Sequence, residues 1–165
     1  MLLRPRARWG ATLVAITTMA LPSRTALAAD PTAALDLGGG VRLELVLVRA
    51  GSFMQGSPPQ EPGRSNDEAA RQVTLSRDYY LGKYPVTRSQ FGRFVSESSY
   101  RTEAERGTSG GSGWDGKGLT QRKELTWYTP GFEQTGDHPV VLVTFDDAVA
   151  FTEWLSKKSG REVAL

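Results

Sequence analysis

The pattern of hydrophobic positions predicts three β segments in the first half of the chain. Residues 41–48 (VRLELVLV) alternate apolar and charged side chains and then become wholly apolar, which is typical of a strand entering a core. Residues 49–57 (RAGSFMQGS) place an aromatic residue and a methionine between glycines, which predicts a strand with a bend. Residues 71–84 predict a further β segment with apolar residues on one face. Residues 29–40 are small and end in three glycines, so we expect a flexible lead-in there.

The first predicted helix begins with a capping box. Thr87 and Gln90 stand three residues apart, so the hydroxyl and the amide can each satisfy a free backbone group at the helix start. Phe91 and Phe94 give this helix one apolar face, and the helix is expected to end near Ser98.

A second capping box predicts the C-terminal helix. Thr144 and Asp147 open a helix over residues 145–159, and Gly160 stops it. Its inner face is predicted to carry three large apolar residues: Phe151, Trp154 and Leu155. If the chain were half of a larger domain, we would expect this inner face to be exposed.

The region between the helices is expected to be long and irregular. Residues 107–118 (GTSGGSGWDGKG) suggest a phosphate-binding loop, but no strand precedes them and no Gly-Lys-Ser/Thr ends them. A solvated loop is therefore the favoured interpretation. Residues 140–143 (VVLV) predict a short buried strand before the last helix. Two roles stay open for the aromatic residues of this region, stacking on a ligand or filling the core: Trp114, Trp127 and Tyr128.

The N-terminal residues 1–28 have the features of a cleavable secretory signal peptide. A basic leader precedes the apolar run 10–21, and Ala26-Leu27-Ala28 supplies the small-residue cleavage pattern. The run is too short to span a bilayer, so we expect an exported, periplasmic or secreted protein without stable membrane insertion. The leader holds four of the 20 Lys and Arg residues and no acidic residue, which leaves 16 basic against 18 acidic residues. This balance gives no reason to expect a nucleic-acid partner.

Residue composition narrows the chemistry that the chain can perform. The sequence contains no cysteine, which excludes a thiol nucleophile, a thiolate metal site and a redox dithiol within it. The sole histidine, His138, has no second histidine with which to share a metal, and a role at a strand entry is favoured. Asp146 and Asp147 form a carboxylate pair, but their place at a helix start is explained by capping and the helix dipole.

Three blocks of the sequence resemble the formylglycine-generating enzyme family, also called the sulfatase-modifying factor domain. Residues 45–57 (LVLVRAGSFMQGS) resemble the family's opening strand and its Pro-Ala-Gly-x-Phe-x-Met-Gly-Ser turn. Residues 71–94 resemble the stretch that follows, with its Val-x-Leu, Tyr, Glu-Val-Thr and Phe positions. Residues 138–155 (HPVVLVTFDDAVAFTEWL) resemble the block Pro-Val-x-x-Val-Ser-Trp-x-Asp-Ala-x-x-Phe/Tyr-Cys-x-Trp-Leu. The blocks come in the family's order over residues 45–165.

The resemblance implies a fold and a set of activities. The expected fold is α+β, C-type-lectin-like and rich in loops, with residues 41–165 as its amino-terminal part and incomplete at the carboxy terminus. Some members are copper-dependent oxidases that convert a sulfatase cysteine to formylglycine through a cysteine pair. Others are periplasmic pigment-maturation proteins or domains of iron-dependent sulfoxide synthases, and several bind without catalysing.

The sequence departs from the family where the chemistry is expected. The block Arg-Leu-Pro-Thr-Glu-Ala-Glu-Trp-Glu should follow Gly160-Arg161, but the sequence ends at Leu165, and the family's catalytic cysteines belong to the part beyond. Thr152 stands where many members have cysteine, and Phe145 where they have tryptophan. We therefore assign no catalytic, cofactor-binding or metal-binding residue in this chain, and its ligand-binding residues are unknown.

Two hypotheses of different class follow. In the first, the chain is a truncated portion of an exported formylglycine-generating-enzyme-like protein, inactive alone, with a sulfatase-like or other exported polypeptide as partner. Copper would belong to full-length catalytic relatives, and calcium stays open as a ligand. In the second, the chain is a small non-catalytic periplasmic module that binds a peptide or glycan through its aromatic loop.

Overall fold

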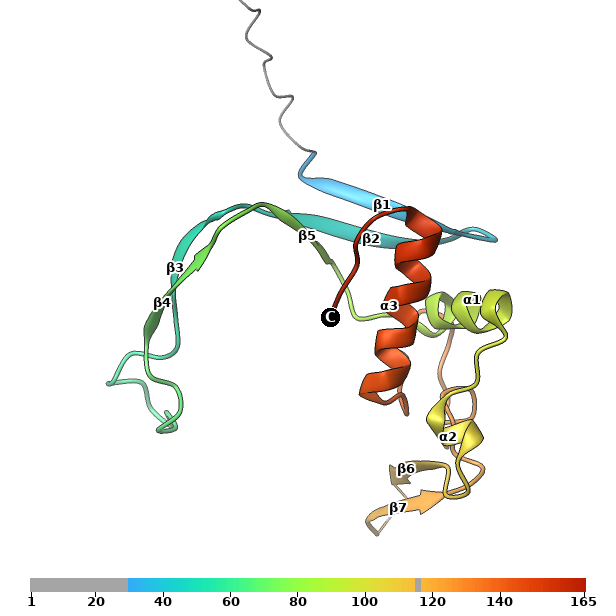
Figure 1. Cartoon of the computed structure of the whole chain (residues 1–165). Helices are drawn as coiled ribbons and strands as arrows, with labels where there is room; N and C mark the ends of the chain where they lie inside the picture. The colour runs from blue at the N-terminus through green and yellow to red at the C-terminus, as the bar shows by residue number, and fades with distance from the viewer. Residues whose placement is uncertain (1–29, 115–116) are drawn as a thin grey trace, which may run out of the picture.

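The computed structural model describes residues 30–114 and 117–165, so the predicted signal peptide lies outside the described residues. Figure 1 shows a body of helices and strands from which a long β-hairpin projects on one side. The elements follow one another as β1 Thr32–Gly38, β2 Val41–Val48, β3 Gly51–Gln55, β4 Arg71–Leu75, β5 Tyr79–Gly82, α1 Arg88–Ser98, α2 Glu103–Arg106, β6 Gly111–Trp114, β7 Leu119–Arg122 and α3 Phe145–Ser159. None of the described helices is long and apolar enough to cross a membrane.

The main sheet is antiparallel, with strand order β1-β2-β5. The expected flexible lead-in at 29–40 is wrong for Thr32–Gly38, which form a strand that pairs with β2 along its length. Alternate side chains of β1 point toward the core, and Leu37 is completely buried. The three glycines that suggested flexibility instead make the tight turn into β2, each with a positive φ.

β3 follows β2 along the chain and pairs with β4 to form a projecting hairpin, which we call the β3–β4 arm. It pairs Gly51–Gln55 with Arg71–Leu75 in antiparallel register. The predicted β segment over 71–84 is therefore two strands, β4 in the arm and β5 in the main sheet. Asp78 fixes the bend between them, because its carboxylate accepts the Ala50 N–H at 2.7 Å and the Arg49 guanidinium at 2.9 Å. The first of these bonds is the main reason that the pKa of Asp78 lies below its usual value.

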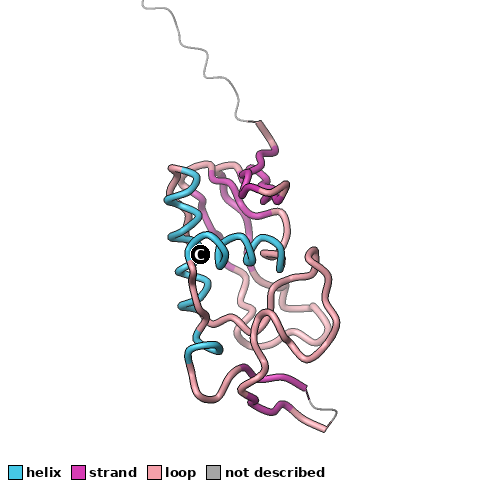
Figure 2. Tube along the Cα trace, turned by 90° about the vertical axis from the view of Figure 1, so that its right-hand side faces the viewer, coloured by secondary structure: helices cyan, strands magenta, loops and turns pink. Residues whose placement is uncertain are grey.

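Both capping boxes are present, so the two main helices begin where the sequence predicts. Thr87 Oγ1 accepts the Gln90 N–H, and the Gln90 side chain accepts the Thr87 N–H at 2.9 Å. α3 repeats this arrangement with Thr144 and Asp147, and Gly160 ends it in the left-handed conformation. Figure 2 shows the two helices crossing, with most loop residues gathered at the end of the body away from the main sheet.

The core lies between the main sheet and the two helices. Its buried side chains come from β1, β2, α1, α3 and one loop: Leu37, Leu43, Phe91, Phe94, Trp127, Phe151 and Leu155. The expected exposure of the α3 inner face in a partial domain is wrong for Phe151 and Leu155, which are only 4% and 3% exposed. They are covered because α1 and the sheet supply facing apolar groups within this chain.

Two expectations for the second half of the chain are wrong. Residues 140–143 form no strand, because Leu142 has a φ of 58°, which extended backbone does not allow. Only Pro139 pairs with Thr87, as an isolated bridge. Residues 107–118 are not solvated loop throughout, since β6 and β7 pair into a short hairpin that contains Gly111–Trp114.

A buried carboxylate ties α3 to the segment that follows α1. Asp147 is fully buried, and its Oδ1 accepts the Tyr100 hydroxyl at 2.9 Å and the Glu103 N–H at 3.0 Å. Its Oδ2 accepts the Thr144 N–H at 2.9 Å. The carboxylate therefore binds the amides that begin both α2 and α3, where the backbone is electropositive. The predicted capping role is confirmed, and the link to Tyr100 and Glu103 is an additional one.

The hydrogen bond between Tyr100 and the buried Asp147 leads us to expect a loss of stability at alkaline pH. Burial, with the hydrogen bond to Asp147, raises the pKa of Tyr100 to about 12. The unfolded hydroxyl titrates near pH 10, so above that pH the unfolded state binds fewer protons than the folded state. The stabilisation is complete below about pH 10 and is lost as the pH rises toward 12. Urea unfolding between pH 8 and 12 should show this decline, and Tyr100→Phe should reduce it while Tyr79→Phe should not.

Candidate binding pocket

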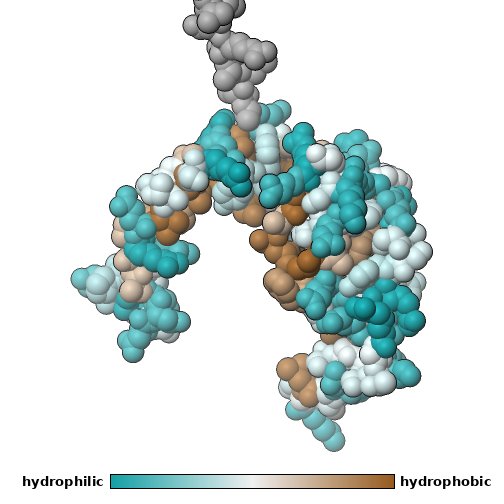
Figure 3. All heavy atoms as spheres, viewed as in Figure 1, coloured by the Kyte–Doolittle hydropathy of each residue, from teal (hydrophilic) through white to brown (hydrophobic). Residues whose placement is uncertain are grey.

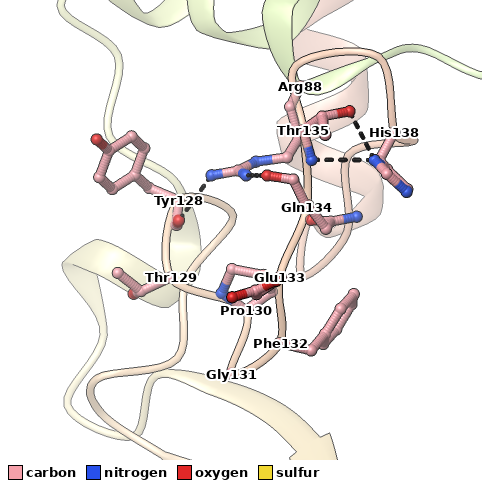
Figure 4. Close-up of a pocket in the computed structure, with 10 residues that line it drawn as sticks. All are labelled: Arg88, Tyr128, Thr129, Pro130, Gly131, Phe132, Glu133, Gln134, Thr135 and His138. Atoms are coloured by element: carbon pink, nitrogen blue, oxygen red, sulfur yellow. Dashed lines mark hydrogen bonds between the residues drawn. The ribbon is translucent and has the colours of Figure 1, made fainter.

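A shallow pocket of about 560 Å³ lies between the start of α1 and the loop 128–138. Figure 4 shows the residues that line it, with Tyr128 and Phe132 at opposite ends of the group. Both aromatic side chains are largely exposed, at 66% and 60%. The pocket thus presents two ring faces to solvent on a loop.

Arg88 holds this loop in place. Its guanidinium donates to the Gln134 carbonyl at 2.7 Å and to the Tyr128 carbonyl at 2.8 Å, and it lies 5.7 Å from the Tyr128 ring centre. The backbone adds two bonds, from the Arg88 N–H to the His138 carbonyl and from the Ser89 N–H to the Gly136 carbonyl, both at 2.9 Å. Arg88 is therefore a positioning residue whose charge is engaged by the protein's own carbonyl groups.

His138 lies at the exposed end of the same loop. Its Nδ1 accepts the Thr135 N–H at 3.0 Å, which assigns the ring proton of the neutral form to Nε2. The sole histidine thus lines the pocket with its Nδ1 engaged by Thr135, and the predicted strand next to it is absent. Beside it, Gln134 Oε1 and Arg88 Nε are buried without a hydrogen-bond partner among the described residues.

The aromatic residues singled out in the sequence separate into different environments. Trp127 is 8% exposed and packs edge-on against Phe91 at 5.3 Å, so it fills the core. Tyr128, its neighbour, points outward and lines the pocket. Trp114 lies on the β6–β7 hairpin, 70% exposed, and does not line the pocket. The core-filling role is therefore confirmed for Trp127, and ligand stacking by Tyr128 or Trp114 stays a prediction.

The sequence reasoning missed Arg88 and Phe132. A cation at the first position of a helix is electrostatically unfavourable, so Arg88 directly after Thr87 is a signal that the side chain is used elsewhere. Phe132 follows Pro130-Gly131 and gives no such signal, because only the folded loop brings it toward Tyr128.

The described residues do not suit a copper or other metal site. They contain no group of three or more His, Cys, Asp or Glu side chains that could hold a metal ion. Asp147 is occupied by three donors of the protein, and His138 has no second histidine or cysteine in the sequence to join it. The described residues of the pocket thus contain no candidate set of metal ligands, and the sequence contains no thiol.

Comparison with known proteins identifies the family and the fold of the chain. The model of the sulfatase-modifying factor enzyme 1-like domain matches residues 41–164. The chain belongs to this family. The structure of PvdO from Pseudomonas aeruginosa matches with a TM-score of 0.63 and 25% sequence identity, over 82% of this chain and 47% of that chain. The loop-rich α+β fold expected from the resemblance is thereby confirmed.

Curated relatives of this sulfatase-modifying-factor-like chain differ in activity. The inactive C-alpha-formylglycine-generating enzyme 2 of Bos taurus is 28% identical, with 78% of this chain and 49% of the relative covered. The formylglycine-generating enzyme of Mycobacterium tuberculosis is 30% identical, with 72% of this chain and 48% of the enzyme covered. The hercynine oxygenase of Mycolicibacterium smegmatis is 26% identical, with 75% of this chain and 31% of the oxygenase covered. The chain spans about half the length of the first two relatives and less of the third.

Proposed function

We propose that this chain is the amino-terminal, non-catalytic portion of an exported sulfatase-modifying-factor-like protein. The observation that carries the proposal is the coverage of the relatives, because the chain matches only about half of their length. The absence of cysteine from the sequence supports it, since the chain then lacks the thiols that the family's oxidases use. Copper, in a complete protein, would be bound by the other half.

Export and truncation can be tested by one measurement. The intact mass of the protein made by its natural source should lack residues 1–28, because the leader carries a cleavage pattern. The mass should also exceed that of residues 29–165. A mass equal to residues 29–165 would contradict truncation, and a mass that retains the leader would contradict export.

A direct assay can test whether this chain lacks formylglycine-generating activity. The purified chain, supplied with copper, oxygen and an external thiol reductant to supply the two electrons that the reaction consumes, should form no aldehyde on a sulfatase-type cysteine peptide. Mass spectrometry would detect formylglycine as a mass change at the cysteine. Formation of that product above the level with copper alone would sink the proposal that this portion is inactive.

A second candidate function is a binding module for a peptide or glycan, and the aromatic pocket favours it. The pocket carries two exposed aromatic rings, and His138 also lines it. Calorimetric titration with a sulfatase-type cysteine peptide should then show binding that Tyr128→Ala weakens by up to about tenfold, because one stacking contact contributes about 0.5–1.5 kcal/mol and about 1.4 kcal/mol corresponds to a tenfold change in Kd. Trp114→Ala is the matched control, since that ring is equally exposed but lies outside the pocket. Absence of binding by the unmodified chain would count against peptide recognition.

A further inference from the structure

β1 leaves one side of its backbone without a partner strand. It is the outermost strand of the main sheet, whose order is β1-β2-β5, and no other strand of residues 30–114 and 117–165 pairs with its outer side. Figure 1 shows β1 along the outside of the body, beyond β2. A strand edge of this kind presents a row of N–H and C=O groups with which another strand can pair.

The hydrogen bonds between β1 and β2 show which backbone groups point outward. The Leu47 N–H donates to the Pro31 carbonyl at 3.0 Å, so Pro31 and every second residue after it face β2. Thr32, Ala34 and Asp36 lie between those residues and direct their N–H and C=O groups away from β2. All three side chains are exposed. The outer edge of β1 therefore offers hydrogen-bonding groups at these three positions.

Contacts at both ends limit the open part of this edge to residues 32–36. Beyond it, the Leu37 carbonyl accepts the Arg93 Nε–H at 3.2 Å. At its start, the Thr32 N–H donates to Asp30 Oδ1 at 3.1 Å, which leaves the Thr32 carbonyl for a partner. The part of β1 that is open to another strand is therefore this short stretch.

The open stretch carries few of the features that keep natural strand edges apart. Proteins protect such edges with lysine, proline, bulges or a covering segment. Residues 32–36 (TAALD) contain one charged side chain, Asp36, and neither lysine nor proline. The register of β1 with β2 becomes irregular only after Asp36. A second strand can therefore approach residues 32–36 closely.

We propose that β1 pairs with β1 of a second copy of this chain, antiparallel and with Ala34 opposite its own counterpart. This register uses the whole open stretch, because Ala34 is its midpoint. It places Asp36 opposite Thr32 of the other copy, whereas a register centred on Asp36 would set two carboxylates against each other. On the inner side of the sheet it brings Leu35, which packs against the core, beside Ala33 of the other copy. Both copies use the same surface, so the contact closes into a dimer.

The proposed contact lies apart from the apolar surface of the molecule. Figure 3 shows hydrophobic residues on the inner side of the arch that the β3–β4 arm and the body form, whereas β1 runs along the outside of this arch (Figure 1). Affinity at β1 therefore comes mainly from backbone hydrogen bonds, as in other cases of strand addition. The pairing goes beyond the proposed function and does not depend on it.

Single cysteines test the register, because the chain has none of its own. Ala34→Cys places two thiols opposite each other, with Cα atoms about 5.5 Å apart, a separation that a disulfide spans. Thr32→Cys is the matched control on the same strand, since Thr32 is also exposed. In the proposed register its two copies lie about 14 Å apart, which is too far for a disulfide. Mild oxidation of the full chain should thus give at least about tenfold more disulfide-linked dimer with Ala34→Cys, as measured on a non-reducing gel.

Sedimentation velocity tests the dimer itself. The unmodified chain and Ala34→Thr should sediment as dimers, and Ala34→Pro as a monomer, because proline removes an outward N–H while the bonds to β2 remain. Circular dichroism checks that Ala34→Pro is folded, and the cysteine variants test the contact without it. A monomeric unmodified chain, a dimeric Ala34→Pro chain, or equal disulfide formation at positions 32 and 34 would each overturn the proposal.

Discussion

Phe91→Ala should lower the free energy of unfolding by about 3–5 kcal/mol, the range for truncating a buried aromatic residue. Phe91 is 2% exposed, and its ring centre lies 5.3 Å from Phe94, 5.3 Å from Trp127 and 6.0 Å from Phe151. Alanine would leave a cavity bordered by three large rings, which cannot close without moving both helices and the loop. The free energy of unfolding of a whole domain is only about 5–15 kcal/mol. The substitution should therefore remove a large share of the stability, and a substantial fraction of the variant should be unfolded at 37 °C.

The measurement is urea unfolding followed by tryptophan fluorescence, with Phe53→Ala as the control. Both substitutions remove a phenylalanine, but Phe53 is half exposed on the arm, so its loss should cost no more than about 1 kcal/mol. Equal effects of the two substitutions would show that the core is not centred on Phe91.

Local signals predicted the two longer helices, α1 and α3, but the short helix α2 was missed although Thr102 and Glu105 form a capping box there. Each capping box involves residues three apart, so the information lies within one helical turn and does not depend on the rest of the chain. The strand at residues 41–48 was equally predictable, because the alternation of apolar and charged residues in its first half indicates one buried face.

Two segments whose conformation depends on residues outside the segment itself were mispredicted. β1 is built largely from small residues and ends in glycines, and it becomes a strand because β2 provides its hydrogen bonds. Residues 140–143 have strand-like composition, but the loop places Leu142 in a left-handed conformation. In both cases tertiary context outweighed local propensity.

The candidate pocket was only partly visible in the sequence. Tyr128 and His138 were identified as residues of interest, but the sequence could not show that Arg88, some 40 residues earlier, holds their loop. Trp127 and Tyr128 are adjacent and chemically similar, and only the direction of the chain decides which one enters the core. Patterns of residue type cannot supply that direction.

Asp147→Ala should destabilise the protein by about 3–5 kcal/mol, because it leaves buried donors without an acceptor. The Thr144 N–H, the Glu103 N–H and the Tyr100 hydroxyl all donate to this carboxylate at 2.9–3.0 Å. Asp147→Asn should cost less, about 1–3 kcal/mol, since its oxygen can serve two donors while its amide group opposes the third. Chemical denaturation of the three proteins at pH 7 gives this order directly.

Asp146→Ala is the matched control, because Asp146 is also acidic and in the first turn of α3 but is exposed. It should cost no more than about 1 kcal/mol, the value of a charge near a helix N-terminus. Hydrogen exchange adds a local readout: the Glu103 amide should lose protection in Asp147→Ala and keep it in Asp146→Ala. If Asp147→Ala were as stable as Asp146→Ala, the carboxylate would be a simple cap. The expected difference instead identifies Asp147 as the group that fixes the segment after α1 to the start of α3.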